Sequence, residues 1–432
     1  REAPPVKVYD SQPFDNTSFV SGHPTIQDAI DASTTLDGYF VNVDAGTYTE
    51  NIDVDKELDI RGANYGVACN ATRSAESIID DAGTTITISS DNVSIDGFTI
   101  SGDTAISSDT FSDINILNNI INADEIGISI TGSTSTNVIQ DNCISLSTQI
   151  AVTNLSNATP DDATVGILIS NASGTNPLTI KDNDIDDAFY GYVINDVNTS
   201  TQTKIEGGNI NGVMQGVALL NTLGGSISSS NLGVENITMS SFSGDYTGIS
   251  ALIPINFHAG VYSFTGGGTT SSELTTLDID NLTIDGTGKP QQNSAAVSIA
   301  DFSSIGKVVQ TVSVTNTTII NNDNRGVDTR GFVDVTVTEN TLTNNGGDAY
   351  GTGGNNGFSI RASRGATLTA SLNDITLPAT SSTVVEALHT SLTPASSIDA
   401  FNNSILVNGN PDGFGANNDA SSTITAECNW WG

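Results

Sequence analysis

Apolar residues recur at every second position along most of the chain, in runs that polar corners interrupt. The stretch 113–132, DINILNNIINADEIGISITG, shows the pattern clearly: isoleucines alternate with polar residues, an Asn-Asn corner follows, and a Gly-Ile-Ser-Ile run begins the next segment. Alternation broken by Asn, Asp and Gly predicts short β-strands joined by tight corners.

The corner recurs along the chain at intervals of 23 to 45 residues. A shortest interval near one coil length, with irregular excess, is typical of a solenoid whose insertions bulge outward as loops. We therefore predict an all-β solenoid of about 13 coils. The predicted corner positions are Asn119, Asn142, Asn183, Gly208, Asn236, Asn281, Asn316, Asn340, Asn373, Asn403 and Asn429.

We interpret these corner asparagines as structural. Asn tolerates the left-handed backbone of a sharp corner, and stacked amides can hydrogen-bond from one coil to the next. Gly208 takes the same place in one coil, which a positive φ would explain. A binding role for this column is not expected.

The N-terminal region departs from the repeat. Residues 1–21 are rich in proline and predict an extended leader. Residues 24–33 predict a short helix that caps the solenoid, with Thr25 as N-cap and Ile26, Ala29 and Ile30 on one apolar face. Residues 22–432 then form a single β-helix domain, which we expect to continue beyond Gly432 in the natural chain.

Two stretches carry a resemblance to a known family. The first, near the start of the chain, reads TIQDAIDAS, then GYFVNVDAGTYTENIDVDKELDIRGAN and SDNVSIDGFTISG; the second is the closing AECNWWG. Both resemble right-handed parallel β-helix proteins of the pectin-lyase-like superfamily. Carbohydrate-binding and sugar-hydrolase repeats belong there, and secreted bacterial members carry Asn-Trp-Trp-Gly coils. The resemblance implies a right-handed parallel β-helix. Because lyases, hydrolases, esterases, tailspikes and non-catalytic surface proteins share this fold, it does not determine the activity.

Charge narrows the choice of partners. The formal net charge of −36 makes nucleic acid and anionic membranes poor partners. No apolar run is long enough for a membrane helix, so no membrane insertion is expected. The three cysteines, Cys69, Cys143 and Cys428, are too scattered for a disulfide framework. We expect them to be small buried hydrophobic residues.

Catalytic motifs of the resembling enzymes are missing. The His-Gly and Arg-x-Lys elements of polygalacturonases do not occur. His389 and Asp301 are the candidates that remain for catalysis, with Glu386 near His389. We favour a protein without turnover and keep a polysaccharide lyase or glycoside hydrolase of the same fold as the alternative.

A group of arginines predicts a possible anion site. Aligning Gly326 with Gly357 places Arg330 and Arg361 in one outward column, with Val327 and Phe358 pointing inward. Pairing with Asp301, Asp328 or Asp334 is the interpretation we favour, and a sulfated or carboxylated glycan is the alternative. The predicted glycan-binding residues are Arg325, Arg330, Arg361, Arg364 and, from an aromatic-rich insertion, Tyr262 and Phe264.

The acidic run 182–187 predicts a second candidate site. With Ile185 inward, Asp184 and Asp186 point outward, and Asp182 and the adjacent coil's Asp141 lie nearby. Such oxygen ligands suit Ca²⁺, although a solvated acidic face is the simpler interpretation. No cofactor is otherwise required.

These observations favour a secreted or cell-surface β-helix with a non-catalytic carbohydrate-binding or adhesive role. Its expected partners are a polysaccharide or cell-surface glycan and other segments of a longer surface protein. A structural spacer in such a protein is the third hypothesis.

Overall fold

The structure is a computed structural model that describes residues 4–134, 136–147, 164–174, 178–195, 197–199, 202–221, 230–240, 259–265, 274–287, 295–301, 310–322, 325–346, 357–381, 384–391, 394–418 and 421–432. The chain forms two compact units. Unit 1 holds residues 1–149, 164–188 and 199–208, and unit 2 holds residues 150–163, 189–198 and 209–432. The single domain predicted over 22–432 stays a prediction.

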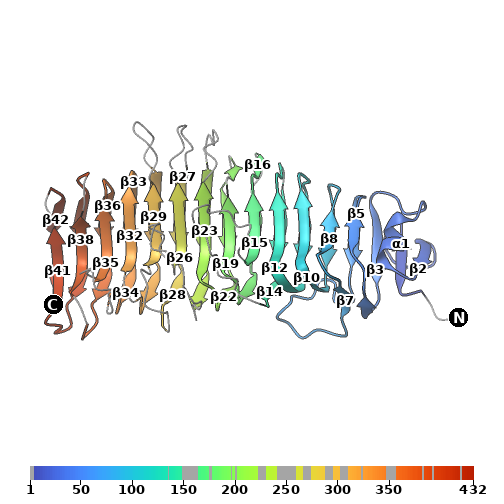
Figure 1. Ribbon diagram of the computed structural model, residues 1–432, viewed down its shortest axis with the longest axis horizontal. Helices are drawn as coiled ribbons and strands as arrows, with labels where there is room; N and C mark the ends of the chain where they lie inside the picture. Colours follow the sequence, from blue (N-terminus) through green and yellow to red (C-terminus); the bar gives the residue numbers. More distant parts are fainter. Residues whose placement is uncertain are drawn as a thin grey trace. The chain divides into compact units, whose positions relative to one another are not determined.

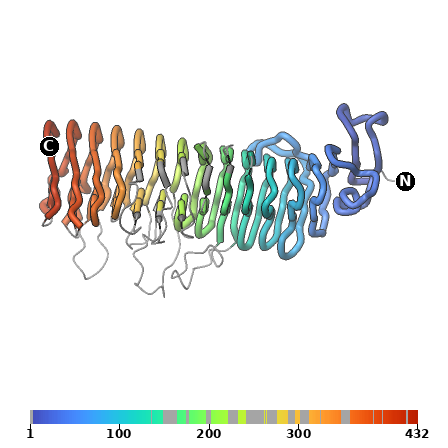
Figure 2. Tube along the Cα trace, turned by 90° about the horizontal axis from the view of Figure 1, so that it is seen from above, coloured from blue at the N-terminus to red at the C-terminus, as the bar shows by residue number. Residues whose placement is uncertain are grey.

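Both units are right-handed parallel β-helices, which confirms the predicted fold class. Each coil contributes one strand to each of three walls, and strands of successive coils pair in parallel (Figures 1 and 2). We call these walls the first, second and third in the order in which a coil visits them.

In unit 1, the second and third walls merge in two coils, because β10 and β12 are long strands that run through both. The remaining strands belong to single walls. The first wall holds β3 (Tyr39–Val43), β6 (Leu58–Arg61), β9 (Ser94–Asp96), β11 (Asn115–Leu117), β13 (Val138–Gln140), β17 (Thr179–Lys181) and β21 (Thr203–Glu206); the second holds β4 (Gly46–Tyr48), β7 (Ser77–Asp80), β14 (Cys143–Leu146) and β18 (Asp184–Asp186); the third holds β5 (Ile52–Val54), β8 (Thr84–Ile88) and β15 (Val165–Ser170); β10 is Thr99–Asp109, β12 is Ile120–Thr131 and a short β16 is Ser173–Gly174.

Unit 2 repeats the same plan with longer third-wall strands. Its first wall holds β24 (Ser230–Glu235), β27 (Leu274–Asp280), β30 (Gln310–Thr315), β33 (Val333–Thr338), β36 (Thr367–Ser371), β39 (Ser397–Phe401) and β42 (Thr423–Glu427); its second holds β22 (Asn209–Asn211), β25 (Thr238–Ser240), β28 (Thr283–Asp285), β31 (Thr318–Ile320), β34 (Thr341–Thr343), β37 (Asp374–Thr376), β40 (Ser404–Leu406) and β43 (Trp430–Trp431); its third holds β19 (Tyr190–Asn195), β23 (Gln215–Asn221), β26 (Ala259–Thr265), β29 (Ala295–Asp301), β32 (Arg325–Gly331), β35 (Gly357–Ser363), β38 (Val385–Ser391) and β41 (Gly413–Asn418). A short β20 is Asn198–Thr199.

The core consists of rows of aliphatic side chains that stack from coil to coil. In the first wall of unit 1, the strand register places six isoleucines in one row, and each is at most 2% exposed. The row is Ile60, Ile95, Ile116, Ile139, Ile180 and Ile205. Because side chains alternate between the two faces of a strand, this row is the direct result of the period-two pattern.

The corner after the first wall is built from two adjacent columns. The buried amides of Asn119, Asn142 and Asn183 form a ladder, in which Asn142 Oδ1 accepts from the Asn119 backbone N–H at 3.0 Å. Asn183 Oδ1 accepts from Asn142 Nδ2 at 2.9 Å. The residue before each rung carries the positive φ: Asn118 (56°), Asp141 (56°) and Asp182 (52°). The amide ladder is thus confirmed. The prediction that the ladder asparagines themselves adopt the left-handed backbone is wrong for Asn119, Asn142 and Asn183, because the preceding residue adopts it instead.

In unit 2 the ladder holds Asn340, Asn373, Asn403 and Asn429, whose amides bond in the same way. Three predicted rungs are wrong by one residue: Asn236, Asn281 and Asn316 have positive φ values of 50–59° and occupy the neighbouring left-handed column. Leu282 and Thr317 take the rungs instead, with the Leu282 N–H donating to Thr317 Oγ1 at 3.3 Å. Asparagine suits both columns, so residue type alone could not separate them.

The N-terminal cap matches the prediction closely. Helix α1 (Ile26–Asp31) begins after Thr25, whose Oγ1 accepts from the Asp28 N–H at 3.1 Å, and Ile26, Ala29 and Ile30 are buried. Most of the described residues before the helix lie in or between two strands. β1 (Val6–Tyr9) pairs antiparallel with both β2 (Phe19–His23) and β3.

The expectation for the cysteines is wrong. Cys69 and Cys143 form a disulfide across 74 residues of sequence, and Cys428 is exposed and free. The loop 62–76 between β6 and β7, which we call the strap, leaves its own coil and brings Cys69 to the start of β14. A partner so distant in sequence cannot be deduced from cysteine spacing.

Candidate functional site

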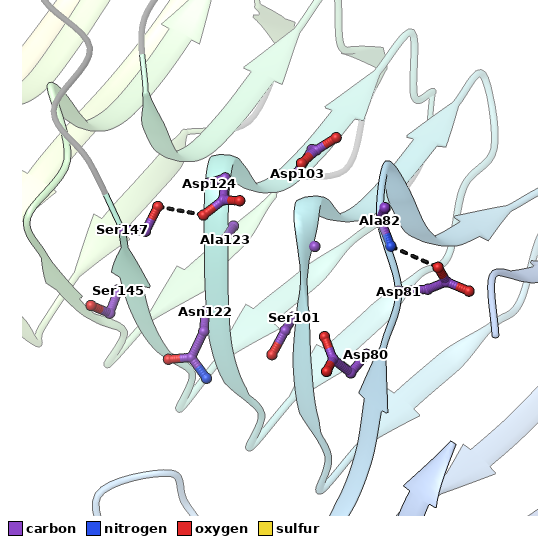
Figure 3. A pocket seen from close by; sticks show the side chains of 11 residues that line it. Asp80, Asp81, Ala82, Ser101, Asp103, Asn122, Ala123, Asp124, Ser145 and Ser147 are labelled. Atoms are coloured by element: carbon purple, nitrogen blue, oxygen red, sulfur yellow. Dashed lines mark hydrogen bonds between the residues drawn. The ribbon is translucent and has the colours of Figure 1, made fainter. Parts of the chain in front are cut away.

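An open groove lies on the outer surface of unit 1, where the second wall turns toward the third (Figure 3). Its volume is about 580 Å³. The strand register aligns Asp80 of β7, Ser101 of β10, Asn122 of β12 and Ser145 of β14 in a single column across four coils. The full lining set is Asp80, Asp81, Ala82, Ser101, Gly102, Asp103, Asn122, Ala123, Asp124, Ser145 and Ser147.

Local hydrogen bonds hold the rim of the groove in place. Asp103 Oδ2 accepts from the Gly83 N–H at 3.1 Å, which joins the turn after β7 to β10. Ser147 donates to Asp124, which joins the segment after β14 to β12 (Figure 3). The groove floor and rim are therefore shaped before any ligand arrives.

The groove is strongly acidic and exposed. Asp80, Asp103 and Asp124 are exposed, Asp81 is half-buried, and no described lining residue is basic. Exposed hydroxyl, amide and carboxylate groups in a hollow are suited to polyhydroxylated ligands, because they offer both donors and acceptors.

The arginines of unit 2 are arranged very differently, as a buried cluster around one carboxylate. Asp328 is 0% exposed, and its Oδ2 accepts from Arg325 Nη1 at 3.0 Å and from Arg330 Nη2 at 2.6 Å. Arg361 Nε lies 2.9 Å from Oδ1 of the same carboxylate, but its N–H is not directed at that oxygen. We call Arg325, Asp328, Arg330 and Arg361 the Asp328 cluster.

The predicted register of the arginines is wrong by two residues. Arg361 pairs with Asp328, and Arg330 pairs with Ser363, so the two arginines are not in one column. Of the three carboxylates predicted as partners of the arginines, Asp328 pairs with Arg325, Arg330 and Arg361. Val327 lies in the core as expected. Phe358 is predicted to point inward too, but it shares the outer face of β35 with Arg361, and the Arg361 guanidinium lies 5.3 Å from the centre of the Phe358 ring.

The charges in the Asp328 cluster perturb one another. Burial by itself would raise the pKa of Asp328, but Arg330, Arg361 and Arg325 outweigh it and hold that pKa well below its usual range. Burial lowers the pKa of Arg361 to about 9, and Asp328 opposes this shift. The aspartate is therefore ionised at every ordinary pH.

A second buried polar group adjoins the cluster in the next coil. His389 pairs in register with Arg361, its ring stacks on Phe358 at 4.2 Å, and its Nδ1 hydrogen-bonds to Glu386. The other Glu386 oxygen accepts from Asn417 Nδ2 at 2.9 Å. Glu386 and His389 are thus in contact, as expected, and the strand register places His389 beside Arg361. A catalytic role for His389 stays a prediction.

The other predicted residues of unit 2 are not part of the Asp328 cluster. Asp301 ends β29 beside Gly331, and Tyr262 and Phe264 pair with Ser298 and Ala300, but their side chains lie outside what the structure describes. Arg364 is exposed, with a φ of 57°. Glycan binding by these residues and by the buried arginines stays a prediction.

The acidic residues proposed for calcium do not converge. Ile185 is buried and Asp186 is exposed, as expected. Asp141 and Asp182 lie in the left-handed column, whereas Asp184 sits opposite Cys143 on the neighbouring strand. Among the described residues, no three of these carboxylates come within 4.8 Å of one another. Calcium binding here stays a prediction.

The groove of unit 1 is the feature that the sequence did not reveal. Its residues come from four coils and from both sides of a strand bend at Gly102, where the β10–β12 register shifts. One signal was present: the Asp-Asp pair at 80–81 lies within the groove. Because Asp-Asp also occurs at 161–162 and 186–187, the pair at 80–81 could not be singled out from the sequence.

Comparison with known proteins gives a limited result. No protein-family model matches the chain. A stretch of 77 residues, 18% of the chain, is 44% identical to a cell surface glycoprotein of Methanothermus fervidus. The match covers only 12% of that relative's length, so the chain is similar to a small part of it.

Proposed function

We propose that this protein is a cell-surface β-helix that binds a carbohydrate without transforming it, and that the groove of unit 1 is the binding site. The observation that carries the proposal is the open hollow lined by hydroxyl, amide and carboxylate groups from four successive coils. Residence at the cell surface and the pectin-lyase-like resemblance are parts of the same proposal.

Two observations support the surface location, and one further finding concerns membrane-spanning helices. The relative with the partial match is named a cell surface glycoprotein. The Cys69–Cys143 disulfide is of a kind that persists in oxidising surroundings outside the cell. Among the described helices, none is long and apolar enough to cross a membrane.

The column Asp80, Ser101, Asn122 and Ser145 supports a linear ligand. Parallel strands lie about 4.8 Å apart, so four coils present a row of polar groups on the order of 14 Å long, comparable to a short oligosaccharide. Asp80 and Asn122 are exposed and donate to or accept from no other side chain that the structure describes, so both are available to sugar hydroxyls.

The charge of the groove indicates which glycans it accepts. Four carboxylates within the hollow, on a chain with a net charge of −36, repel a polyanion. We therefore propose a neutral or amino-substituted glycan. Polysaccharides rich in uronate or sulfate should bind poorly, and added salt should weaken that repulsion.

A glycan array probed with the full chain, with calcium and with a chelator, tests the proposal. We expect neutral glycans among the hits, and the double variant Asp80→Ala with Asn122→Ala should weaken binding by about 5- to 100-fold, since each lost hydrogen bond costs about 0.5–1.5 kcal/mol. The matched control, Asp109→Ala with Asn115→Ala, removes the same residue types outside the groove.

Equal binding by the groove and control variants would refute the groove as the site. Release of unsaturated or reducing ends from a bound glycan, abolished by His389→Ala, would instead favour the lyase or hydrolase alternative. A chain that binds no glycan under either condition would leave the structural spacer as the better description.

A further inference from the structure

The strap of unit 1 is fastened to the second-wall corner at two places. Arg73 donates to the backbone carbonyls of Asn118 at 2.6 Å and Phe98 at 3.3 Å, so it bonds to two coils at once. Farther along, the Cys69 N–H donates to the Asp141 carbonyl at 3.2 Å. In Figure 1 the strap is the blue loop that runs from beside β7 toward β14.

Three metal-binding side chains meet where the strap ends its excursion. The sulfur atoms of Cys69 and Cys143 and a carboxylate oxygen of Asp184 all lie within 4.8 Å of one another. They come from three separate segments: the strap, β14 and β18. Cys143 and Asp184 are direct register partners on adjacent coils, so they project side by side from the same face.

We propose that, when the disulfide is reduced, Cys69, Cys143 and Asp184 bind a thiophilic divalent cation such as Zn²⁺. Thiolate sulfur and carboxylate oxygen are both zinc ligands in proteins, and a water molecule would complete the tetrahedron. The disulfide and the metal are thus two alternative ways to fasten the strap.

The conversion from the disulfide to the metal form requires two reactants, a thiol reductant and the cation. A thiol reductant donates two electrons and two protons, which cleaves the Cys69–Cys143 bond and oxidises the reductant to its own disulfide. The cation then replaces the two thiol protons, which pass to solvent, so binding weakens as the pH falls. Reoxidation requires release of the cation first.

The site stays assembled after reduction because other contacts hold its parts. The Cys69–Asp141 backbone bond and the Arg73 bonds do not depend on the disulfide. Asn70 Nδ2 donates to Asp184 Oδ2 at 3.3 Å, which orients the carboxylate from the strap side. Zinc–sulfur bonds of about 2.3 Å require the two sulfur atoms to separate by roughly 2 Å, a movement that cysteine side chains can make.

The metal form would connect more of the fold than the disulfide does. The disulfide joins the strap to β14, whereas the cation would join the strap, β14 and β18. Cys69 is buried, at 7% exposed, and Cys143 and Asp184 are half-buried. We therefore expect the metal to recover the thermal stability that reduction removes.

Cobalt titration of the reduced protein tests this proposal, because Co²⁺ reports thiolate ligation and tetrahedral geometry by its absorption. Cys428 is exposed and free, so the reference protein carries Cys428→Ser. We expect one Co²⁺ per chain with sulfur-to-cobalt charge-transfer absorption, displaced by Zn²⁺, and a rise in the melting temperature of the reduced protein on binding. The oxidised protein should show neither response.

Three variants separate this site from adventitious binding. Cys143→Ser should abolish the charge-transfer band. Asp184→Asn leaves the disulfide intact, so this variant folds under oxidising conditions. After reduction, it should raise the dissociation constant for Co²⁺ by at least about tenfold, and Asn70→Ala should do the same. Asp186→Asn, two residues along the same strand, is the control and should change nothing.

Absence of a charge-transfer band in a reduced protein that keeps its native circular dichroism would overturn the proposal. So would Co²⁺ binding that Cys143→Ser or the oxidised form retains. Loss of native structure on reduction, with no recovery when Co²⁺ or Zn²⁺ is added, would also count against it.

Discussion

The groove of unit 1 and the Asp328 cluster of unit 2 are both polar sites on the outer faces of walls, but they differ in exposure. The groove side chains are mostly exposed and form few bonds beyond its rim. The cluster side chains are at most 10% exposed, and three arginines share one carboxylate. One arrangement leaves polar groups for a ligand, while the other uses them to hold neighbouring coils together.

The comparison shows why residue type misleads in a solenoid. Arginines are rare in this acidic chain, so their grouping at 325–364 predicts an anion site. Burial reverses that inference, because a buried charge needs a fixed counter-charge within the protein. Aspartates are common and predict little, yet three of the four in the groove are exposed within one hollow.

Removing the central carboxylate should give the largest effect on stability. Asp328→Asn leaves three buried guanidinium groups without their shared anion, so we expect a loss of about 3–5 kcal/mol in the free energy of unfolding. Asp334→Asn makes the same change at an exposed position on the next strand of the chain and should cost almost nothing. Urea unfolding of both variants checks the contrast, which fails if the two are equally stable.

Acid should lower the stability that the Asp328 cluster contributes, and Asp328→Asn should remove this part of the pH dependence. The pKa of Asp328 is lowered in the folded state from its ordinary value of 3.8, so its contribution is complete above that value. It declines as the pH falls below it, because the unfolded chain takes up the proton first. Urea midpoints at neutral pH and near pH 3 should differ more for the wild type than for the variant. Identical differences would exclude this role.

Breaking the amide ladder should have the next largest effect. Asn142→Leu removes the acceptor of the Asn119 N–H and the donor to the Ile116 carbonyl, both buried, so we expect a loss of about 2–4 kcal/mol. Asn115→Leu places the same change on a half-buried asparagine outside the ladder and should cost far less. Comparable melting temperatures for the two variants would contradict the ladder.

The sequence predicted whatever repeats in every coil and missed whatever occurs once. The isoleucine rows and the rungs at Asn119 and Asn142 follow from period-two alternation and from recurring corners. The pairing of Arg361 with Asp328 depends on the length of a single coil. An error of two residues in that length gives Arg361 the wrong partner, Arg330. The Cys69–Cys143 bond and the groove depend on contacts between coils, which a single sequence does not encode locally.

The left-handed column offers the smallest effect and tests the correction to the corner. Leu372 has a φ of 55° and is 53% exposed, so it is strained without packing to compensate. Leu372→Asn should stabilise the protein by about 0.5–1 kcal/mol, and the reverse change, Asn402→Leu, should destabilise it by a similar amount. Thermal melting distinguishes these signs, and a loss of stability for Leu372→Asn would place the strain elsewhere.

The account's central claim is that recognition belongs to the groove and stability to the buried cluster. One measurement tests it most directly: glycan affinity and melting temperature determined together for Asp80→Ala with Asn122→Ala and for Asp328→Asn. We predict that the groove variant loses glycan affinity at an unchanged melting temperature. The cluster variant should lose thermal stability while its folded fraction binds the glycan as the wild type does. Glycan affinity lost in folded Asp328→Asn, and kept in the groove variant, would contradict the claim.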